Sequence, residues 1–357
     1  MRFVIFGLTV SSAWGNGHAT LWRGLIGALD AMGHTVTFYE RDVPYYAAHR
    51  DLAALPGRAE LRLYSDWALV AGDAARASDQ ADVAMVTSYC FDGRAACELV
   101  LGSRAPARVF YDLDTPVTLA RLDLGEDVPY LPREGLAGFD LVLSFTGGRA
   151  LERLRAQLGA GRVAPLFGSV DPDAYRAGPR EPAWAGDCSY LGTWSADRQH
   201  ALDRLLFEPA RRRPARRFVL GGSKYPDDLA WPANLTRLEH VPPGAHPRFY
   251  ASSPLTLNVT RAPMAALGFC PSGRLFEAAA CGVPVLSDAW PGLDDFFTPG
   301  EEILIAHTAD DALAAMDLGP IALARIGARA RARVYGQHSA RHRALELITL
   351  IERGGGP

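Results

Sequence analysis

The stretch "SGRLFEAAACGVPVLSD", residues 272–288, places a single acid, Glu277, near the start of an otherwise alanine-rich segment. It predicts a helix that ends at a Cys-Gly pair, followed by a short buried strand that ends on Ser287 and Asp288. The apolar residues around Glu277 indicate a helix that is buried on most sides. Because a buried acid needs polar partners, we expect a ligand to be one of them.

Short apolar runs alternate with helical segments on both sides of this stretch. Continuous apolarity in such runs favours parallel sheets covered on both faces. The sequence therefore predicts an α/β protein with two Rossmann-like, doubly wound parallel-sheet domains that face each other across a cleft, where ligands bind at the carboxyl ends of the strands. The runs lie at residues 2–7, 35–40, 82–88, 108–113 and 140–145, and again at 188–194, 216–222, 236–241, 255–260, 283–288 and 302–307.

A chain of 357 residues exceeds the size at which a single core keeps growing. We expect an N-terminal domain over residues 1–170 and, after a Pro-, Gly- and Asp-rich linker at 171–187, a C-terminal domain over 188–335. A C-terminal helix over 336–357 is expected to pack back on the N-terminal domain.

Composition narrows the classes of partner. A net charge of −3 and no basic block longer than "RRR" (211–213) give no reason to expect a nucleic-acid partner. No apolar run approaches the ~18 residues of a membrane span, so no integral membrane segment is expected. Five cysteines without paired CxxC spacing indicate reduced thiols and a cytoplasmic location.

Small residues follow the first predicted strand. Gly15 and Gly17 precede His18 in "LTVSSAWGNGHAT" (8–20), so a ligand can approach the backbone at a helix start. His18 is a candidate general base, and the structural alternative is that it only satisfies its loop. Glu40 ends the second strand, where a dinucleotide fold holds a ribose. Since the GxGxxG pattern is missing, a nicotinamide oxidoreductase is the weaker alternative.

Two cations follow neighbouring strands in the second half: Arg198 in "YLGTWSADRQ" and Lys224 in "VLGGSKYP". Fixed positive charge beside glycine-rich backbone suits a diphosphate. The loop "GFCPSG" (268–273) leads into the helix of Glu277, whose free N–H groups also suit an anion. Glu277 can accept hydrogen bonds from two vicinal hydroxyls, as on a ribose, and the alternative is a surface acid that complements the helix dipole.

Six motifs carry a resemblance that covers nearly the whole chain. They are "YDLDTPVTLARL", "FDLVLSFTGG", "GSVDPDAY", "GTWSADRQ", "TLNVTR" and "RLFEAAACG", in that order. In these motifs the chain resembles GT-B glycosyltransferases, and in particular their spore-maturation-type (CgeB-like) branch, which is related to the retaining glycosyltransferase group 1 family. The block "RLFEAAACG" is the most specific element.

The resemblance implies a transfer of a hexosyl or related group from a nucleoside-diphosphate sugar, such as a UDP-sugar, to a hydroxyl-bearing acceptor. Catalysis would be metal-independent and retaining, and the acceptor is a small molecule, a glycan or a protein. Glu277 would hold the ribose, and Arg198 stands at the family's diphosphate-binding lysine. Thr193 stands where many relatives have Arg, Val241 would border the base, and the loop of Gly15 and Gly17 would meet the donor.

One departure concerns the second glutamate of retaining relatives, eight residues before the ribose-binding one, where this chain has Phe269. The carboxylate that contacts the donor sugar in relatives is therefore absent or supplied elsewhere. Contacts to phosphate are expected from Arg261 and from the helix start formed by Ser272, Gly273 and Arg274.

The "DLD" at 112–114 allows two interpretations. Two acids around one residue can hold Mg²⁺ or Mn²⁺, but we favour an acceptor-binding or general-base role for Asp114, with a helix N-cap as the structural alternative. We expect no metal and no cofactor beyond the nucleotide-sugar co-substrate. Two other functions stay open: a nucleotide-sugar epimerase, and a non-catalytic binder of nucleotides or sugars.

Overall fold

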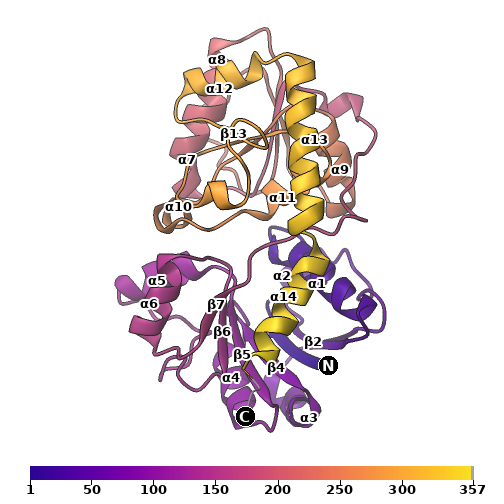
Figure 1. Ribbon diagram of the computed structural model, residues 1–357, viewed down its shortest axis with the longest axis vertical. Coiled ribbons are helices and arrows are strands. Elements are labelled where there is room, and N and C mark those ends of the chain that lie inside the picture. The colour runs from indigo at the N-terminus through magenta and orange to yellow at the C-terminus, as the bar shows by residue number, and fades with distance from the viewer. Residues whose placement is uncertain (355–357) are drawn as a thin grey trace. The chain divides into compact units, whose positions relative to one another are not determined.

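The structure is a computed structural model that describes residues 1–354, and the chain divides into two compact units (Figure 1). Unit 1 comprises Met1–Phe167 together with the segment that starts at Ala340, and unit 2 comprises Gly168–Ser339. The residues expected to form a separate linker, 171–187, thus belong to unit 2. Each unit is built around one parallel sheet, which confirms the predicted fold class of two parallel-sheet α/β domains.

Unit 1 has a seven-stranded sheet in the order β3-β2-β1-β4-β5-β6-β7, with every neighbouring pair parallel. The strands are β1 (Arg2–Gly7), β2 (Thr35–Arg41), β3 (Glu60–Tyr64), β4 (Val83–Thr87), β5 (Ala107–Asp112), β6 (Leu141–Ser144) and β7 (Val163–Pro165). The helices are α1 (His18–Ala31), α2 (Pro44–Ala47), α3 (Trp67–Gln80), α4 (Gly93–Gly102), α5 (Thr115–Asp123), α6 (Arg149–Leu158) and α14 (Ala340–Glu352).

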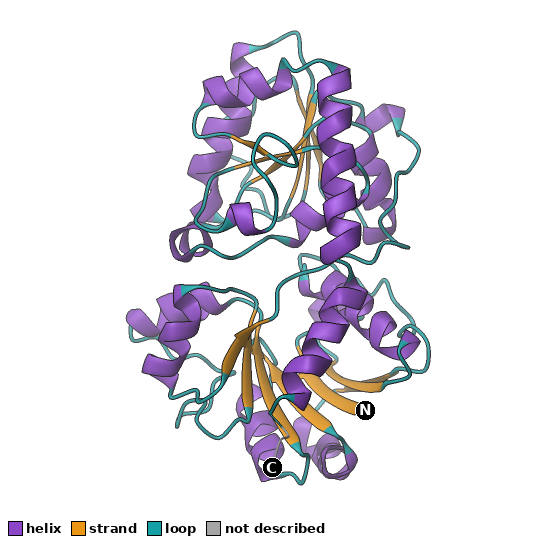
Figure 2. Cartoon of the chain, in the orientation of Figure 1, coloured by secondary structure: helices purple, strands orange, loops and turns teal. Residues whose placement is uncertain are grey.

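The residues of strand β1 are buried on both faces of this sheet. Val4 and Phe6 point into a core shared with α3, α4 and α6, whereas Phe3 and Ile5 point into a second core shared with α1 and α14. Successive side chains of a strand alternate between the two faces, so a strand that is apolar throughout needs helices on both. Figure 2 shows the helices that flank the strands.

Unit 2 repeats this plan with a six-stranded parallel sheet in the order β10-β9-β8-β11-β12-β13. The strands are β8 (Cys188–Leu191), β9 (Phe218–Gly221), β10 (Leu235–Leu238), β11 (Thr256–Asn258), β12 (Val285–Ser287) and β13 (Leu304–Ile305). The helices are α7 (Ala196–Leu202), α8 (Glu208–Arg212), α9 (His246–Ala251), α10 (Ala262–Leu267), α11 (Gly273–Ala280), α12 (Ala309–Met316) and α13 (Pro320–Gln337), with short helical turns at Pro182–Trp184, Asp203–Phe207, Pro243–Ala245 and Leu293–Asp295.

The strand orders locate the places where ligands can bind. In both sheets the chain winds outward in one direction from the first strand and then resumes on its other side, so the connections diverge between β1 and β4 and between β8 and β11. Ligands of open parallel sheets bind in the crevice at the carboxyl ends of the strands at such a point.

The C-terminal segment differs from the single helix expected over 336–357. Helix α13 ends at Gln337, and Ser339 forms a parallel bridge with Val170 before α14 begins at Ala340. Helix α14 packs in unit 1, where Leu347 joins the core that contains Trp22 of α1. No helix within residues 1–354 combines the length and the apolarity needed to cross a membrane.

Candidate functional site

The loop between β1 and α1 is shaped by Glu40 from the end of β2. The buried carboxylate accepts hydrogen bonds from the Thr9 hydroxyl (2.7 Å), from the Val10 N–H (2.8 Å), and from both the backbone and the hydroxyl of Ser11. All its acceptor capacity is thus used inside the protein. Glu40 holds a loop in place, and the one residue that suggested a nicotinamide cofactor is not available to a ribose.

The same loop presents His18 as the first residue of α1. Gly15 adopts a φ of +60°, a conformation that favours glycine, and the Asn16 side chain accepts a hydrogen bond from the His18 N–H (3.0 Å). Gly17 is exposed, and a β-carbon placed there would meet nothing within 4 Å. The chain thus leaves open space beside the helix start.

His18 and Asp114 lie together at the carboxyl edge of the unit 1 sheet. Their Nε2 and Oδ2 atoms are 3.6 Å apart, with 19% and 18% of the side chains exposed. Asp114 occupies the N-cap position of α5, but its side chain makes no capping hydrogen bond. The His18 Nδ1 is buried and has no hydrogen-bond partner within the described chain. The structure therefore brings together the two residues predicted to act on an acceptor.

Asp112, two residues earlier, is fully buried at the end of β5. Its Oδ1 accepts the Asp114 N–H (3.1 Å), while its Oδ2 has no hydrogen-bond partner among residues 1–354. Burial raises the pKa of this carboxyl to about 6, partly opposed by nearby hydrogen-bond donors. The two acids of the "DLD" motif thus differ: Asp112 is buried and accepts a hydrogen bond from the backbone of Asp114, whereas the Asp114 side chain is partly exposed.

The raised pKa of Asp112 predicts a pH-dependent stability. An acid whose pKa rises on folding, here from 3.8 to about 6, stabilises the protein at low pH and loses that contribution as pH rises through about 6. Part of this loss already falls below pH 5, so Asp112→Asn should gain roughly 1–1.5 kcal/mol relative to wild type between pH 5 and 7.5. The measurement is thermal unfolding across this range.

Asp140→Asn is the matched control for this prediction. Its hydrogen bond to Arg108 lowers the pKa of the Asp140 carboxyl, so this acid stays ionised above pH 5 and its contribution to stability is constant there. A difference between wild type and Asp112→Asn that does not change with pH would contradict the prediction.

Within residues 1–354, three residues other than glycine have a positive φ, and all three lie in loops beside candidate site residues: Tyr89 (+63°), Lys224 (+67°) and Phe269 (+48°). Such conformations cost free energy and persist where the surroundings enforce them. The Tyr89 ring follows β4, and its centroid lies 5.8 Å from that of His18. Tyr89 could not be predicted from the sequence as a site residue, because backbone strain of this kind leaves no signal in composition.

In unit 2 the loops after β8 and β9 pack backbone against backbone. A β-carbon on Gly222, whose φ is +150°, would lie 2.0 Å from the Gly192 oxygen. A β-carbon on Gly192 would lie 2.6 Å from the Tyr190 hydroxyl and 2.7 Å from the Arg274 Nη2. These glycines bring the two predicted phosphate loops together, and the exposed Lys224 follows the second of them.

The two predicted cations Arg198 and Arg261 differ in whether an acid within the protein balances their charge. Arg198 donates from Nη1 to the Thr193 carbonyl (2.9 Å), and its buried Nε has no partner within residues 1–354. Arg261 is paired with Asp197, with Nε and Oδ2 3.0 Å apart. The charge of Arg261 is therefore already balanced, whereas no acid is paired with Arg198 in the described chain.

Arg274 lies at the point where the unit 2 connections diverge. It donates from Nε to the Leu191 carbonyl at the end of β8 and from Nη1 to the Asn258 Oδ1 at the end of β11 (2.7 Å). Its guanidinium carbon also lies 4.9 Å from the centre of the Tyr190 ring. This side chain joins two strand ends and holds fixed positive charge at the carboxyl edge of the sheet.

Glu277 lies one turn into α11 with 13% of its side chain exposed. Its Oε2 accepts a hydrogen bond from the Tyr250 hydroxyl (3.0 Å), and within the described chain its Oε1 accepts none. Burial, and then Glu277 itself, raise the pKa of Tyr250 well above its usual value, so this hydroxyl stays protonated and donates. One carboxylate oxygen is therefore held by the protein while the other remains available.

The start of α11 is open next to that available oxygen. Ser272 caps the helix by accepting the Arg274 N–H, and a β-carbon on Gly273 would have only the Glu277 Oε1, at 3.9 Å, within 4 Å. Phe269 stands before this start, and Val241 is 97% buried, since only 3% of it is exposed. The helix start, Glu277 and the cations of the preceding loops share the carboxyl edge of one sheet.

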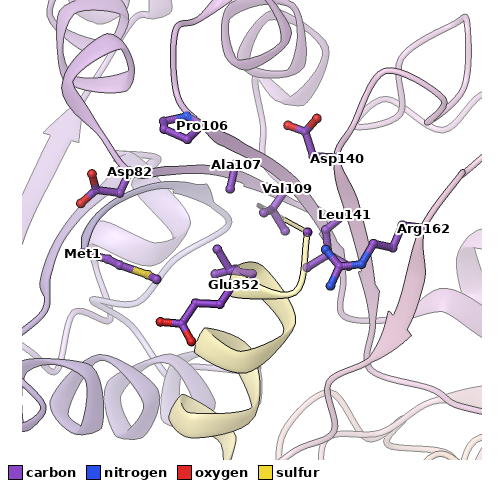
Figure 3. Close-up of a pocket in the computed structure, with 11 residues that line it drawn as sticks. Met1, Asp82, Pro106, Ala107, Val109, Asp140, Leu141, Arg162 and Glu352 are labelled. Atoms are coloured by element: carbon purple, nitrogen blue, oxygen red, sulfur yellow. The ribbon is translucent and has the colours of Figure 1, made fainter. Parts of the chain in front are cut away.

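A cavity of about 570 Å³ in unit 1 lies away from these residues. Figure 3 shows Met1, Ala107 and Leu141 at the amino ends of the strands, with Glu352 of α14 and Arg162 beside them. This is the sheet edge opposite to that of His18 and Asp114, so we assign the cavity to the packing of α14. Within residues 1–354, no three His, Cys, Asp or Glu side chains gather as a metal site would require.

A family model described as "Glycosyl transferase-like" matches residues 198–349, and no curated protein matches the chain. Among solved structures, sucrose-phosphate synthase from Thermosynechococcus elongatus shares 14% identity with a TM-score of 0.69, over 99% of both chains. An alpha-glucosyltransferase in complex with UDP and a 13-mer DNA shares 13% identity with a TM-score of 0.69, also over 99% of both chains. Anabaena HepE in complex with UDP-glucose shares 14% identity with a TM-score of 0.65, over 98% of this chain and 99% of that one. The family model covers less than half of the chain, and at these identities the solved structures show the fold alone, which is that of GT-B glycosyltransferases.

Proposed function

We propose that this protein transfers a hexosyl group from a UDP-sugar to a hydroxyl-bearing acceptor, with retention of configuration and without a metal. The observation that carries the proposal is the half-satisfied carboxylate of Glu277 beside an open helix start. The neighbours bound to UDP and UDP-glucose support the choice of nucleotide. The motifs of the sequence, "RLFEAAACG" above all, support a place in the spore-maturation-type branch.

In this proposal unit 2 binds the donor. Glu277 Oε1 accepts hydrogen bonds from the two ribose hydroxyls, and residues near Val241 border the base. Arg198, Lys224 and the start of α11 at Ser272 and Gly273 stabilise the charge that develops on the leaving diphosphate, which is usually the largest electrostatic contribution to such a transfer. Arg274 contributes positive potential from its fixed position at the strand ends, and the Thr193 carbonyl orients Arg198 by accepting a hydrogen bond from it.

Unit 1 supplies the acid–base pair for the acceptor. The bond between the sugar C1 and the diphosphate oxygen breaks with its electron pair on the diphosphate, and the acceptor oxygen forms the new bond to C1 from the same face. The acceptor proton passes to Asp114 or to His18, which lie 3.6 Å apart and share it. Gly17, in the same loop as Gly15, leaves open space at this helix start.

The first test is a thermal-shift screen of nucleoside diphosphates, nucleotide sugars and NADPH. We expect UDP and UDP-glucose to add about 2.7 kcal/mol of apparent stability at a hundred times the dissociation constant, with no shift from NADPH. UDP release that depends on an added hydroxyl acceptor would then establish transfer. Interconversion of UDP-sugars without acceptor would instead indicate an epimerase, and binding without turnover a non-catalytic relative.

A further inference from the structure

Glu277 is held by a chain of side chains that continues beyond Tyr250. The His246 Nδ1 lies 3.7 Å from the Glu277 Oε2, and 14% of the His246 side chain is exposed. The same Nδ1 lies 3.0 Å from the hydroxyl of Tyr175, a buried residue of the segment that enters unit 2 after Phe167. Tyr175, which is distant from Glu277 in the sequence, thus contacts His246, which in turn lies beside Glu277.

Two hydrogen bonds hold the ring of His246. Its Nε2 lies 3.1 Å from the Val241 carbonyl, and because a carbonyl oxygen can only accept, Nε2 donates. In the neutral ring, Nδ1 therefore accepts, and the Tyr175 hydroxyl is its donor. Without that hydroxyl, the His246 ring loses one of the contacts that fix its orientation beside the Glu277 Oε2.

The segment around Tyr175 is itself tied to the Glu277 helix. The Tyr335 hydroxyl of α13 lies 3.5 Å from the Tyr175 carbonyl and 3.3 Å from the carbonyl of Ala280, the last residue of α11. The Tyr175 N–H donates to the Asp171 carbonyl (2.9 Å). The backbone of the segment is thus anchored independently of the Tyr175 hydroxyl, so this hydroxyl can be tested apart from the fold.

We propose that Tyr175 and His246 are positioning residues for the nucleotide ribose: the Tyr175 hydroxyl holds the His246 ring, and His246 and Tyr250 hold one oxygen of the Glu277 carboxylate in place, which leaves the other oxygen to the ribose. The inference rests on the proposed function of Glu277. It assigns ribose selectivity to a tyrosine that never touches the nucleotide.

The test compares the affinity of the full-length protein for UDP with that for 2′,3′-dideoxy-UDP, which lacks the hydroxyls that Glu277 would bind. We expect wild type to prefer UDP by about 10- to 100-fold, since two hydrogen bonds to a charged group are lost in the analogue. Tyr175→Phe and His246→Gln should reduce this preference by about 3- to 10-fold while binding of the dideoxy analogue stays unchanged. Tyr335→Phe, which loosens the same segment without touching His246, should keep it.

Glu277→Gln distinguishes the positioning role of Tyr175 and His246 from the ribose-binding role of Glu277. If the preference for UDP vanishes in this variant but persists in Tyr175→Phe and His246→Gln, the positioning role is wrong and the proposed function stands. If wild type shows no preference, or Glu277→Gln retains it, the proposed ribose role of Glu277 fails and the inference with it. If Tyr335→Phe loses the preference as fully as Tyr175→Phe, loosening of the segment explains the effect and the inference is overturned.

Discussion

Glu277→Gln is expected to weaken UDP binding by about 10- to 100-fold, because a hydrogen bond to a charged acceptor stabilises by about 1.5–3 kcal/mol. The amide keeps the shape of the side chain and an oxygen for the Tyr250 hydroxyl, which accounts for the only hydrogen bond to this carboxylate within the described chain. The free energy of unfolding should therefore change by no more than about 1 kcal/mol. Isothermal titration with UDP and thermal unfolding measure the two quantities.

Two further variants sharpen this result. Glu277→Ala should weaken UDP binding at least as much but should also lower stability, since it leaves the buried Tyr250 hydroxyl without an acceptor. Glu301→Gln is the control, because Glu301 is 61% exposed and pairs only with Arg329 on the surface. Equal UDP affinity in wild type and Glu277→Gln would remove this acid from the donor site.

Asp114→Asn is expected to lower kcat for transfer by about 10²- to 10⁴-fold, the usual effect of losing a general base. Its carboxylate does not cap α5, so replacement by the amide should leave that helix intact. UDP affinity should stay within about twofold of wild type, because Asp114 lies in unit 1, whereas the residues proposed to contact the ribose, base and diphosphate lie in unit 2. Steady-state kinetics with UDP-glucose and a hydroxyl acceptor give kcat, and titration gives the affinity.

His18→Gln tests whether the two residues act as a pair. If His18 and Asp114 share the acceptor proton, the double variant should be little worse than the more damaging single one, because residues that act as a unit lose their effect together. Multiplicative losses would assign them separate roles. Unchanged kcat in both single variants would move the acid–base chemistry elsewhere in the protein.

Much of the fold could be predicted because buried parallel strands are continuous apolar runs. The strands that escaped prediction were β3 and β7. Strand β3 is a charged edge strand in which three of the five residues of "ELRLY" are exposed, and β7 is only three residues long. Strand β3 lacks the apolar run on which the prediction relied, since an edge strand needs only one paired neighbour and a partly covered face. Strand β7, "VAP", is apolar, but it is too short and ends in a proline, which is unfavourable inside a sheet.

The candidate site divides in the same way. Glu277, Asp114 and His18 could be singled out because each stands at a predicted helix start, which local sequence reveals. Tyr250, His246 and Tyr175 could not, because they approach Glu277 from separate segments and only the folded chain brings them together. The ion pair between Arg261 and Asp197 could not be predicted either, since it joins residues 64 positions apart.

The interruption of unit 1 by unit 2 has a consequence for how this protein is made. The ribosome synthesises all of unit 2 before it adds Ala344, Leu347 and Ile351, which complete the apolar face over α1. Residues 1–167 of unit 1 therefore keep an uncovered apolar surface until helix α14 has been synthesised. Met1 and Glu352 line one cavity. A circular permutant that joins the two ends and begins at Ala340 would therefore make unit 1 contiguous in sequence, so that its core could be completed before unit 2 is synthesised.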